Sequence, residues 1–208
     1  VEQGDIVNKE VDALIVGHIE DGGKLGGALV AIDEVLGGEI TAALEAKEFE
    51  GKFLTSLTVR SHGRLSAKHV VIVGEGKKKD LTVERVRQAT GVGLKVAKKL
   101  KAESIATVLI GAGRGEQNPR AVAQAVTEGL LLTNYTFDTW KKKDEANPKV
   151  VIKTATIVEL ASGKMKRAIQ GSELGEVFAK GTLHARDLVN EVPSDMLPST
   201  LKKIAEKI

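Results

Sequence analysis

The chain has 208 residues, of which 42% are apolar and 28% charged, with a formal net charge of +3; this composition supports a folded core and excludes the disordered and fibrous classes. It contains no cysteine, which excludes a disulfide framework and a thiolate metal site, and no apolar run is long enough to cross a bilayer. The first residues, VEQGDIVNKE, have neither a basic nor an apolar leader region, so we expect no signal peptide, no membrane partner and a cytoplasmic location.

Five short segments have the pattern of strands. Residues 12–19, 69–74 and 104–110 are nearly continuous apolar runs rich in β-branched side chains, which is typical of strands buried on both faces. Residues 57–60 alternate between polar and apolar, which indicates a half-buried strand. Residues 150–158 are a long strand candidate near the end of the sheet.

Helical patterns separate these strands. Residues 28–36 form a short amphipathic stretch that ends at a pair of glycines. Thr82 is a suitable N-cap for a helix that runs to about Lys101, and Asn118 followed by Pro119 is a suitable start for the next. Strands that alternate with helices predict an α/β domain with a largely parallel sheet over residues 1–160.

The pattern changes in the last quarter of the chain. Ser172 to Val189 is one continuous helical pattern, and Pro198 begins a second helix that is unfinished at the last residue. We therefore interpret residues 161–192 as a linker helix and residues 193–208 as the start of a further domain.

Four stretches of the chain, at residues 33–38, 71–77, 125–143 and 185–201, occur in an order and with residues that resemble leucyl aminopeptidases of the two-metal type. ARDLVNE at 185–191, followed by Pro193 and LPSTL at 197–201, is similar to the junction between the linker helix and the catalytic domain of that family, although Leu197 stands where the family usually has a capping Thr. The other three stretches are AVTEGLLLTNYTFDTWKKK at 125–143, VIVGEGK at 71–77 and DEVLGG at 33–38.

The resemblance implies a non-catalytic N-terminal domain with a macro-domain-like fold, a mixed and largely parallel sheet flanked by helices. It implies partners in its own C-terminal catalytic domain and in the other subunits of a homohexamer, with a role in assembly and active-site access. In the full-length parent it implies metal-dependent release of N-terminal amino acids, Leu favoured, from peptides. Two divalent metals, Mn or Zn, would be held by the catalytic domain, so we expect no catalytic residue, metal ligand or cofactor in this chain, and no hydrolysis by it alone.

One alternative is a nucleotide-binding module. Gly4-Asp5-Ile6 ahead of residues 12–16 resembles the opening of ADP-ribose-binding macro domains, in which the Asp holds the adenine amine and glycine loops hold the diphosphate. Gly17-His18 replaces the Asn-rich stretch that contacts the distal ribose, so we expect no appreciable ADP-ribose binding. The counterparts of the nucleotide contacts would be Asp5, Gly26, Gly27, Gly111, Gly113 and Gly115.

A second alternative is a DNA-binding accessory domain, a role that some bacterial members of the family also have. Arg87, Lys95, Lys98 and Lys99 fall on the polar side of the helix that Thr82 begins. A net charge of +3 over 208 residues is a weak field, so any binding should be non-specific and should fall steeply with salt. The more ordinary interpretation of these cations is a solvated helix face.

Overall fold

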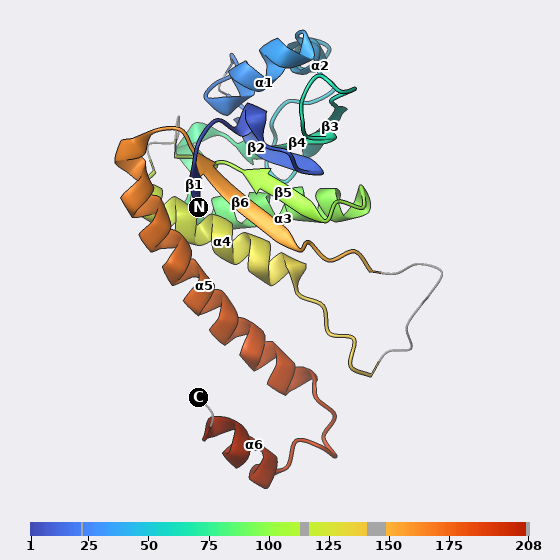
Figure 1. The fold of residues 1–208 in the computed structure, drawn as a ribbon, viewed down its shortest axis with the longest axis vertical. Coiled ribbons are helices and arrows are strands. Elements are labelled where there is room, and N and C mark those ends of the chain that lie inside the picture. Colours follow the sequence, from blue (N-terminus) through green and yellow to red (C-terminus); the bar gives the residue numbers. More distant parts are fainter. Residues whose placement is uncertain (22, 113–116, 141–148, 207–208) are drawn as a thin grey trace.

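A six-stranded sheet with the order β1-β6-β5-β2-β4-β3 forms the centre of the molecule (Figure 1). The computed structural model describes residues 1–21, 23–112, 117–140 and 149–206. Neighbouring strands are parallel throughout, except that β3 pairs antiparallel with β4. The predicted α/β fold with a mixed, largely parallel sheet is therefore confirmed. The strands are β1 (Glu2–Gln3), β2 (Ala13–Ile19), β3 (Ser56–Arg60), β4 (His69–Gly76), β5 (Ser104–Thr107) and β6 (Thr154–Glu159).

Helices cover both faces of the sheet (Figure 1). Strand β2 contributes to both cores: Leu14 and Val16 pack with α1 and α2, whereas Ala13 and Ile15 pack with α3 and α4. Its nearly continuous apolar sequence is explained by this burial on both sides. The helices are α1 (Ala28–Leu36), α2 (Glu39–Glu45), α3 (Val83–Lys99), α4 (Pro119–Asn134), α5 (Ser162–Asn190) and α6 (Pro198–Ala205), with short 3-10 turns at Ile6–Asn8 and Lys78–Asp80.

The predicted helix starts are confirmed by their capping hydrogen bonds. The Thr82 hydroxyl accepts a hydrogen bond from the Arg85 backbone N–H at 3.2 Å at the start of α3. The Asn118 side chain accepts one from the Arg120 N–H at 3.0 Å at the start of α4. These side chains satisfy amide groups that the first turn of a helix leaves without partners.

Several elements differ from their predictions. Strand β5 ends at Thr107 rather than at residue 110, and β6 begins at Thr154 rather than at residue 150. The two glycines that follow the apolar run predict a glycine loop at Gly74-Glu75-Gly76, but this segment belongs to β4. The neighbouring backbone pairs with this segment: the Gly74 N–H donates to the Thr55 carbonyl and the Gly76 N–H to the Gly51 carbonyl, at 2.9 and 3.0 Å.

Helix α5 spans Ser162–Asn190, close to the linker helix interpreted at residues 161–192, and it begins ten residues before the continuous pattern that starts at Ser172. Ala168, Gly171, Gly175 and Ala179 are its buried residues, and α5 packs along α4 over much of its length (Figure 1). A row of small residues lets two helix backbones approach closely, so α5 packs directly against α4. None of the helices in the described part of the chain has the length and apolar character needed to cross a membrane.

Candidate ligand-binding cleft at the carboxyl ends of the strands

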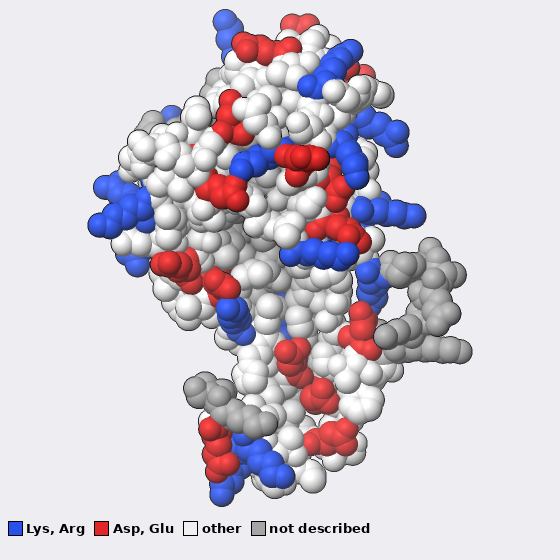
Figure 2. All heavy atoms as spheres, viewed as in Figure 1, with Lys and Arg blue, Asp and Glu red and all other residues white. Residues whose placement is uncertain are grey.

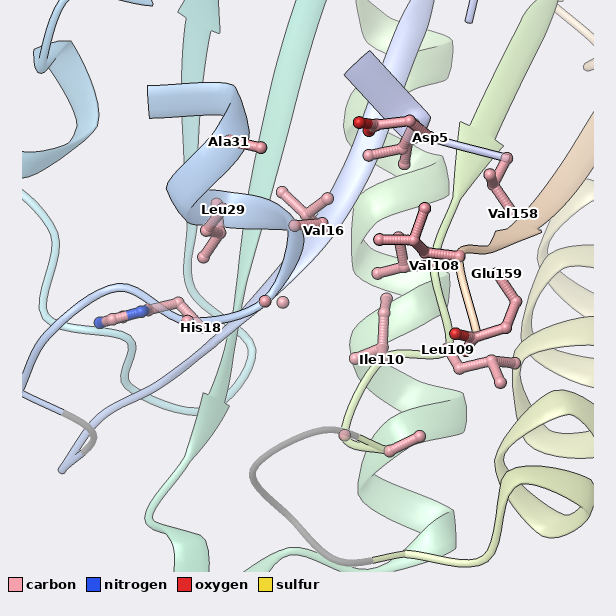
Figure 3. Close-up of a pocket in the computed structure, with 18 of the residues that line it drawn as sticks. Asp5, Val16, His18, Leu29, Ala31, Val108, Leu109, Ile110, Val158 and Glu159 are labelled. Carbon is pink, nitrogen blue, oxygen red and sulfur yellow. The ribbon is translucent and has the colours of Figure 1, made fainter. Parts of the chain in front are cut away.

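A cavity of about 390 Å³ opens where β2, β5 and β6 end, and the start of α1 forms part of its wall (Figure 3). Strand β2 lies between β4 and β5, and the chain crosses from one of these neighbours to the other through α3. In open α/β sheets, ligands bind outside the carboxyl ends of the strands at such a change of direction. The cavity therefore occupies the place where the topology favours a ligand.

The structure brings together four of the residues that sequence analysis suggested as nucleotide contacts. Asp5, Gly26, Gly27 and Gly111 all line the cavity. The Asp5 carboxylate already accepts a hydrogen bond from the Val7 N–H at 3.0 Å, which caps the short 3-10 turn. The other two suggested contacts, Gly113 and Gly115, lie outside the described residues.

Glu75 is the cleft residue that sequence analysis did not identify. Its side chain lines the cavity, yet the residue is only 4% exposed. Among the described residues, its Oε2 atom is the buried side-chain oxygen without a hydrogen-bond partner. A Cβ atom added to Gly17 would lie 2.0 Å from Glu75 Oε1, so the absence of a side chain at Gly17 makes room for this carboxyl group.

Glu75 has apolar surroundings and lies close to Gly111, one of the residues suggested as nucleotide contacts. A Cβ atom added to Gly111 would lie 3.4 Å from Glu75 Oε2 and close to the side chains of Val86 and Leu81. Burial raises the pKa of Glu75 to about 7, because an enclosed site disfavours the charged form. The available sequence signal was one acidic residue at the end of a buried apolar strand.

Acidic side chains outnumber basic ones on the cavity lining. Asp5, Glu75 and Glu159 supply three carboxyl groups, and Lys164 supplies one ammonium group. His18 also contributes to the lining, but its ring is directed away from the labelled apolar residues (Figure 3) and packs against Phe49 with ring centroids 6.1 Å apart. The remaining walls are mostly apolar, and they include Val16, Leu29, Val108, Ile110 and Val158.

The four cations suggested as a nucleic-acid contact do not form one free basic patch. Arg87 is partly buried; its Nε donates to Glu128 Oε2 at 2.6 Å, and it also pairs with Glu84. Lys98 is half-buried, with its Nζ 3.5 Å from the Asn134 carbonyl oxygen, and burial lowers its pKa. Lys95 and Lys99 are exposed.

Charges of both signs are mixed on the face of the molecule that Figure 2 shows. A mixed distribution produces a weaker long-range field than a continuous basic surface would. Among the described residues, no group of three or more His, Cys, Asp or Glu side chains is arranged to hold a metal ion.

Comparison with known proteins identifies the family. Residues 15–144 match the model of the cytosol aminopeptidase family, N-terminal domain. A probable cytosol aminopeptidase of Alkaliphilus oremlandii is 34% identical over 91% of this chain and 37% of its own length. One from Geobacter sp. strain M21 is 34% identical over 94% of this chain and 38% of its own length. This chain thus spans less than half the length of these relatives.

Solved structures show the same fold. A tomato leucine aminopeptidase mutant superimposes with a TM-score of 0.79 at 21% identity, over 99% of this chain and 40% of that one. A macrodomain from Oceanobacillus iheyensis superimposes with a TM-score of 0.63 at 15% identity, over 86% of this chain and 90% of that one. The predicted macro-domain-like architecture is confirmed.

Proposed function

Because this chain belongs to the cytosol aminopeptidase family through its N-terminal domain, we propose that it is the non-catalytic N-terminal part of a metal-dependent aminopeptidase. The parent would release N-terminal amino acids, Leu favoured, from peptides in the cytoplasm. The matched family model is that of an N-terminal domain, and this chain spans 37% and 38% of two relatives. These two findings support a catalytic apparatus elsewhere in the parent.

The observation that carries the proposal is the exposure of several large apolar side chains along α5 and α6. One narrow row of small residues contacts α4, whereas Val177 and Phe178 are 65% and 53% exposed. Val189 near the end of α5 is 84% exposed, and Leu197 and Leu201 around α6 are also exposed. Large apolar side chains exposed along two neighbouring helices support a surface that another protein element covers. We assign that element to the catalytic domain of the same polypeptide.

In this proposal the two divalent metals, Mn or Zn, are bound by the catalytic domain, and no step of the reaction uses a residue of this chain. The chain contributes assembly, by holding the catalytic domain through α5 and α6 and by meeting other subunits of a homohexamer. Light scattering of the full-length parent tests the hexamer directly: a monomeric mass under conditions of full activity would contradict it.

The test of the α5 surface uses the full-length parent and the variant Phe178→Asp. Placing a carboxylate in an apolar contact leaves it desolvated and unpaired, so we expect peptidase activity on leucine p-nitroanilide to fall by about tenfold or more. Val35→Asp is the matched control, since Val35 is a partly exposed apolar residue of α1, at the opposite end of the molecule (Figure 1). Equal activity in both variants would count against docking at α5.

A second measurement tests whether catalysis requires the part of the parent outside this chain. The 208-residue chain alone, supplied with Mn or Zn, should not hydrolyse leucine p-nitroanilide, whereas the full-length parent should. Metal-dependent turnover by a homogeneous preparation of this chain would overturn the proposal.

A further inference from the structure

The peptidase proposal leaves the buried carboxyl group of the cleft without a role. Glu75 lines a cavity of about 390 Å³, is 4% exposed, and has one oxygen without a hydrogen-bond partner among the described residues. Buried polar groups normally have partners, because burying one without a partner costs free energy. An unsatisfied acceptor in a cavity of ligand-binding size indicates a missing donor.

The position of this carboxyl group argues against a phosphate-bearing ligand. Glu75 Oε2 lies close to Gly111, on the loop that would have to approach a diphosphate, and Gly26 and Gly27 line the same cavity. An ionised carboxylate there repels a phosphate group. Asp5 and Glu159 add two further carboxyl groups to the lining, against the single ammonium group of Lys164.

We propose that the cleft binds a small apolar primary amine, whose ammonium group donates hydrogen bonds to the carboxylate of Glu75. An ammonium–carboxylate contact is a charge-assisted hydrogen bond and is strong where water is largely excluded. Val16, Val108 and Ile110 form apolar walls on which the carbon skeleton of the ligand packs. A free carboxylate on the ligand would weaken binding, because the lining already has an excess of acidic groups.

The pH dependence of binding follows from the ionisation of Glu75. The pKa of Glu75 is raised to about 7 by burial, whereas an alkyl ammonium group remains charged well above that pH. Affinity should therefore rise as pH increases through 7 and then level off. The other ionisable side chains nearest the site are Asp5 on the N-terminal segment, His18 on β2, Glu159 on β6, Lys164 on α5, and Arg85 on α3 with its neighbour Asp80.

The probes are isoamylamine, isoamyl alcohol, isovalerate and ADP-ribose, each titrated into the 208-residue chain by calorimetry above about pH 7. The first three share an apolar skeleton and differ in the charge of the polar group. We expect isoamylamine to bind at least about tenfold more tightly than the alcohol, because only the amine forms a charge-assisted bond. Isovalerate and ADP-ribose should bind more weakly than the amine or not at all.

Glu75→Gln should lower the affinity for isoamylamine by about tenfold or more. Glu45→Gln is the matched control, since Glu45 is an exposed residue of α2 away from the cleft, and its affinity should equal that of the original chain. Circular dichroism checks that the Glu75→Gln substitution leaves the fold intact. If that variant does not fold, the affinity of the original chain, measured from about one unit below to one unit above pH 7, provides the same test.

Three results would overturn the proposal: equal binding of amine and alcohol, tighter binding of ADP-ribose than of isoamylamine, or amine binding that is unaffected by both Glu75→Gln and pH. No amine binding at millimolar concentrations would also overturn it. Peptidase activity of the full-length parent does not enter this test, so the cleft proposal and the peptidase proposal can each fail separately.

Discussion

Gly171 of α5 lies so close to Arg120 of α4 that a Cβ atom added to it would stand 2.0 Å from the Arg120 carbonyl oxygen. Two helix backbones therefore touch at this point, and an added methyl group would have to separate them. The contact fixes α5 against α4, and with it the exposed apolar side chains that we assign to the docking of the catalytic domain.

Gly171→Ala should destabilise the chain by about 1–3 kcal/mol, because overpacking outweighs the gain in helix propensity. Gly181→Ala in the same helix is the control: nothing lies within 4 Å of an added Cβ, so this variant should be stabilised by about 0.5–1 kcal/mol. Urea unfolding measures both. A stabilised Gly171→Ala chain would show that α4 and α5 are not closely packed.

The raised pKa of Glu75 predicts how stability changes with pH. The ordinary pKa of a glutamate is 4.5 and that of folded Glu75 is about 7, so the folded state favours the protonated form. Protonated Glu75 contributes about 3 kcal/mol to the free energy of unfolding. This contribution is fully present below about pH 4.5, falls as pH rises, and is lost above about pH 7. Glu75→Gln should remove this decline in urea-unfolding free energy, whereas Glu45→Gln should retain it. Parallel curves for all three proteins would contradict the burial of a titrating carboxyl group.

Asp12 predicts the opposite dependence at lower pH. It accepts hydrogen bonds from Lys68 at 2.7 Å and from the backbone N–H groups of Glu103 and Ser104 at 2.9 and 3.0 Å, and these contacts hold its pKa well below the usual range. The stabilisation is present above the ordinary pKa of about 3.8 and is lost as pH falls through the lower folded value.

Asp12→Ala should therefore cost about 2 kcal/mol at neutral pH, since it removes the acceptor for the Glu103 and Ser104 N–H groups. Lys68→Ala should cost about 0.5 kcal/mol or less, because the Lys68 side chain is 72% exposed. Denaturant unfolding at neutral pH measures the loss of unfolding free energy in each variant. Equal losses would mean that the surface ion pair, rather than the link to the start of β5, supplies the stabilisation.

DNA binding should be weak and sensitive to salt. Arg87 is paired with Glu84 and Glu128, so Lys95 and Lys99 are the exposed members of the suggested patch. In a gel-shift assay at low salt, we expect the double variant Lys95→Ala and Lys99→Ala to lose any DNA binding that the original chain shows. The original chain should lose this binding at moderate salt. Salt-resistant, sequence-selective binding would show that this surface has a nucleic-acid function.

The parts of the fold that depend on nearby residues could be predicted from the sequence. The capping roles of Thr82 and Asn118 are local, and burial of β2 on both faces was evident from its apolar run. The two-residue strand β1 was not predictable, because it is defined by pairing with Val158 and Glu159 far along the chain. Helix α2 was missed because the buried Asp33 carboxylate, seven residues earlier, accepts the Ile40 N–H at 2.7 Å.

The cleft shows the same limit. The glycines at 26, 27 and 111 could be suggested together from the resemblance to macro domains, but Glu75 could not be assigned to them. Its place depends on the absence of a side chain at Gly17 on an adjacent strand, and on backbone pairing that holds Gly74 and Gly76 in β4. Both are tertiary effects without a local sequence signal.

Pairing of β1 with β6 also bears on the order in which the molecule takes shape. Glu2 and Gln3 lie beside Val158 and Glu159, and the cleft draws on segments from Gly4 to Lys164. Bringing such distant segments together carries a large loop-closure cost, so these contacts should form late in folding. On the ribosome, a nascent chain would lack the complete cavity until Lys164 had emerged. Until β6 had been synthesised, Glu2 and Gln3 would have no strand with which to pair.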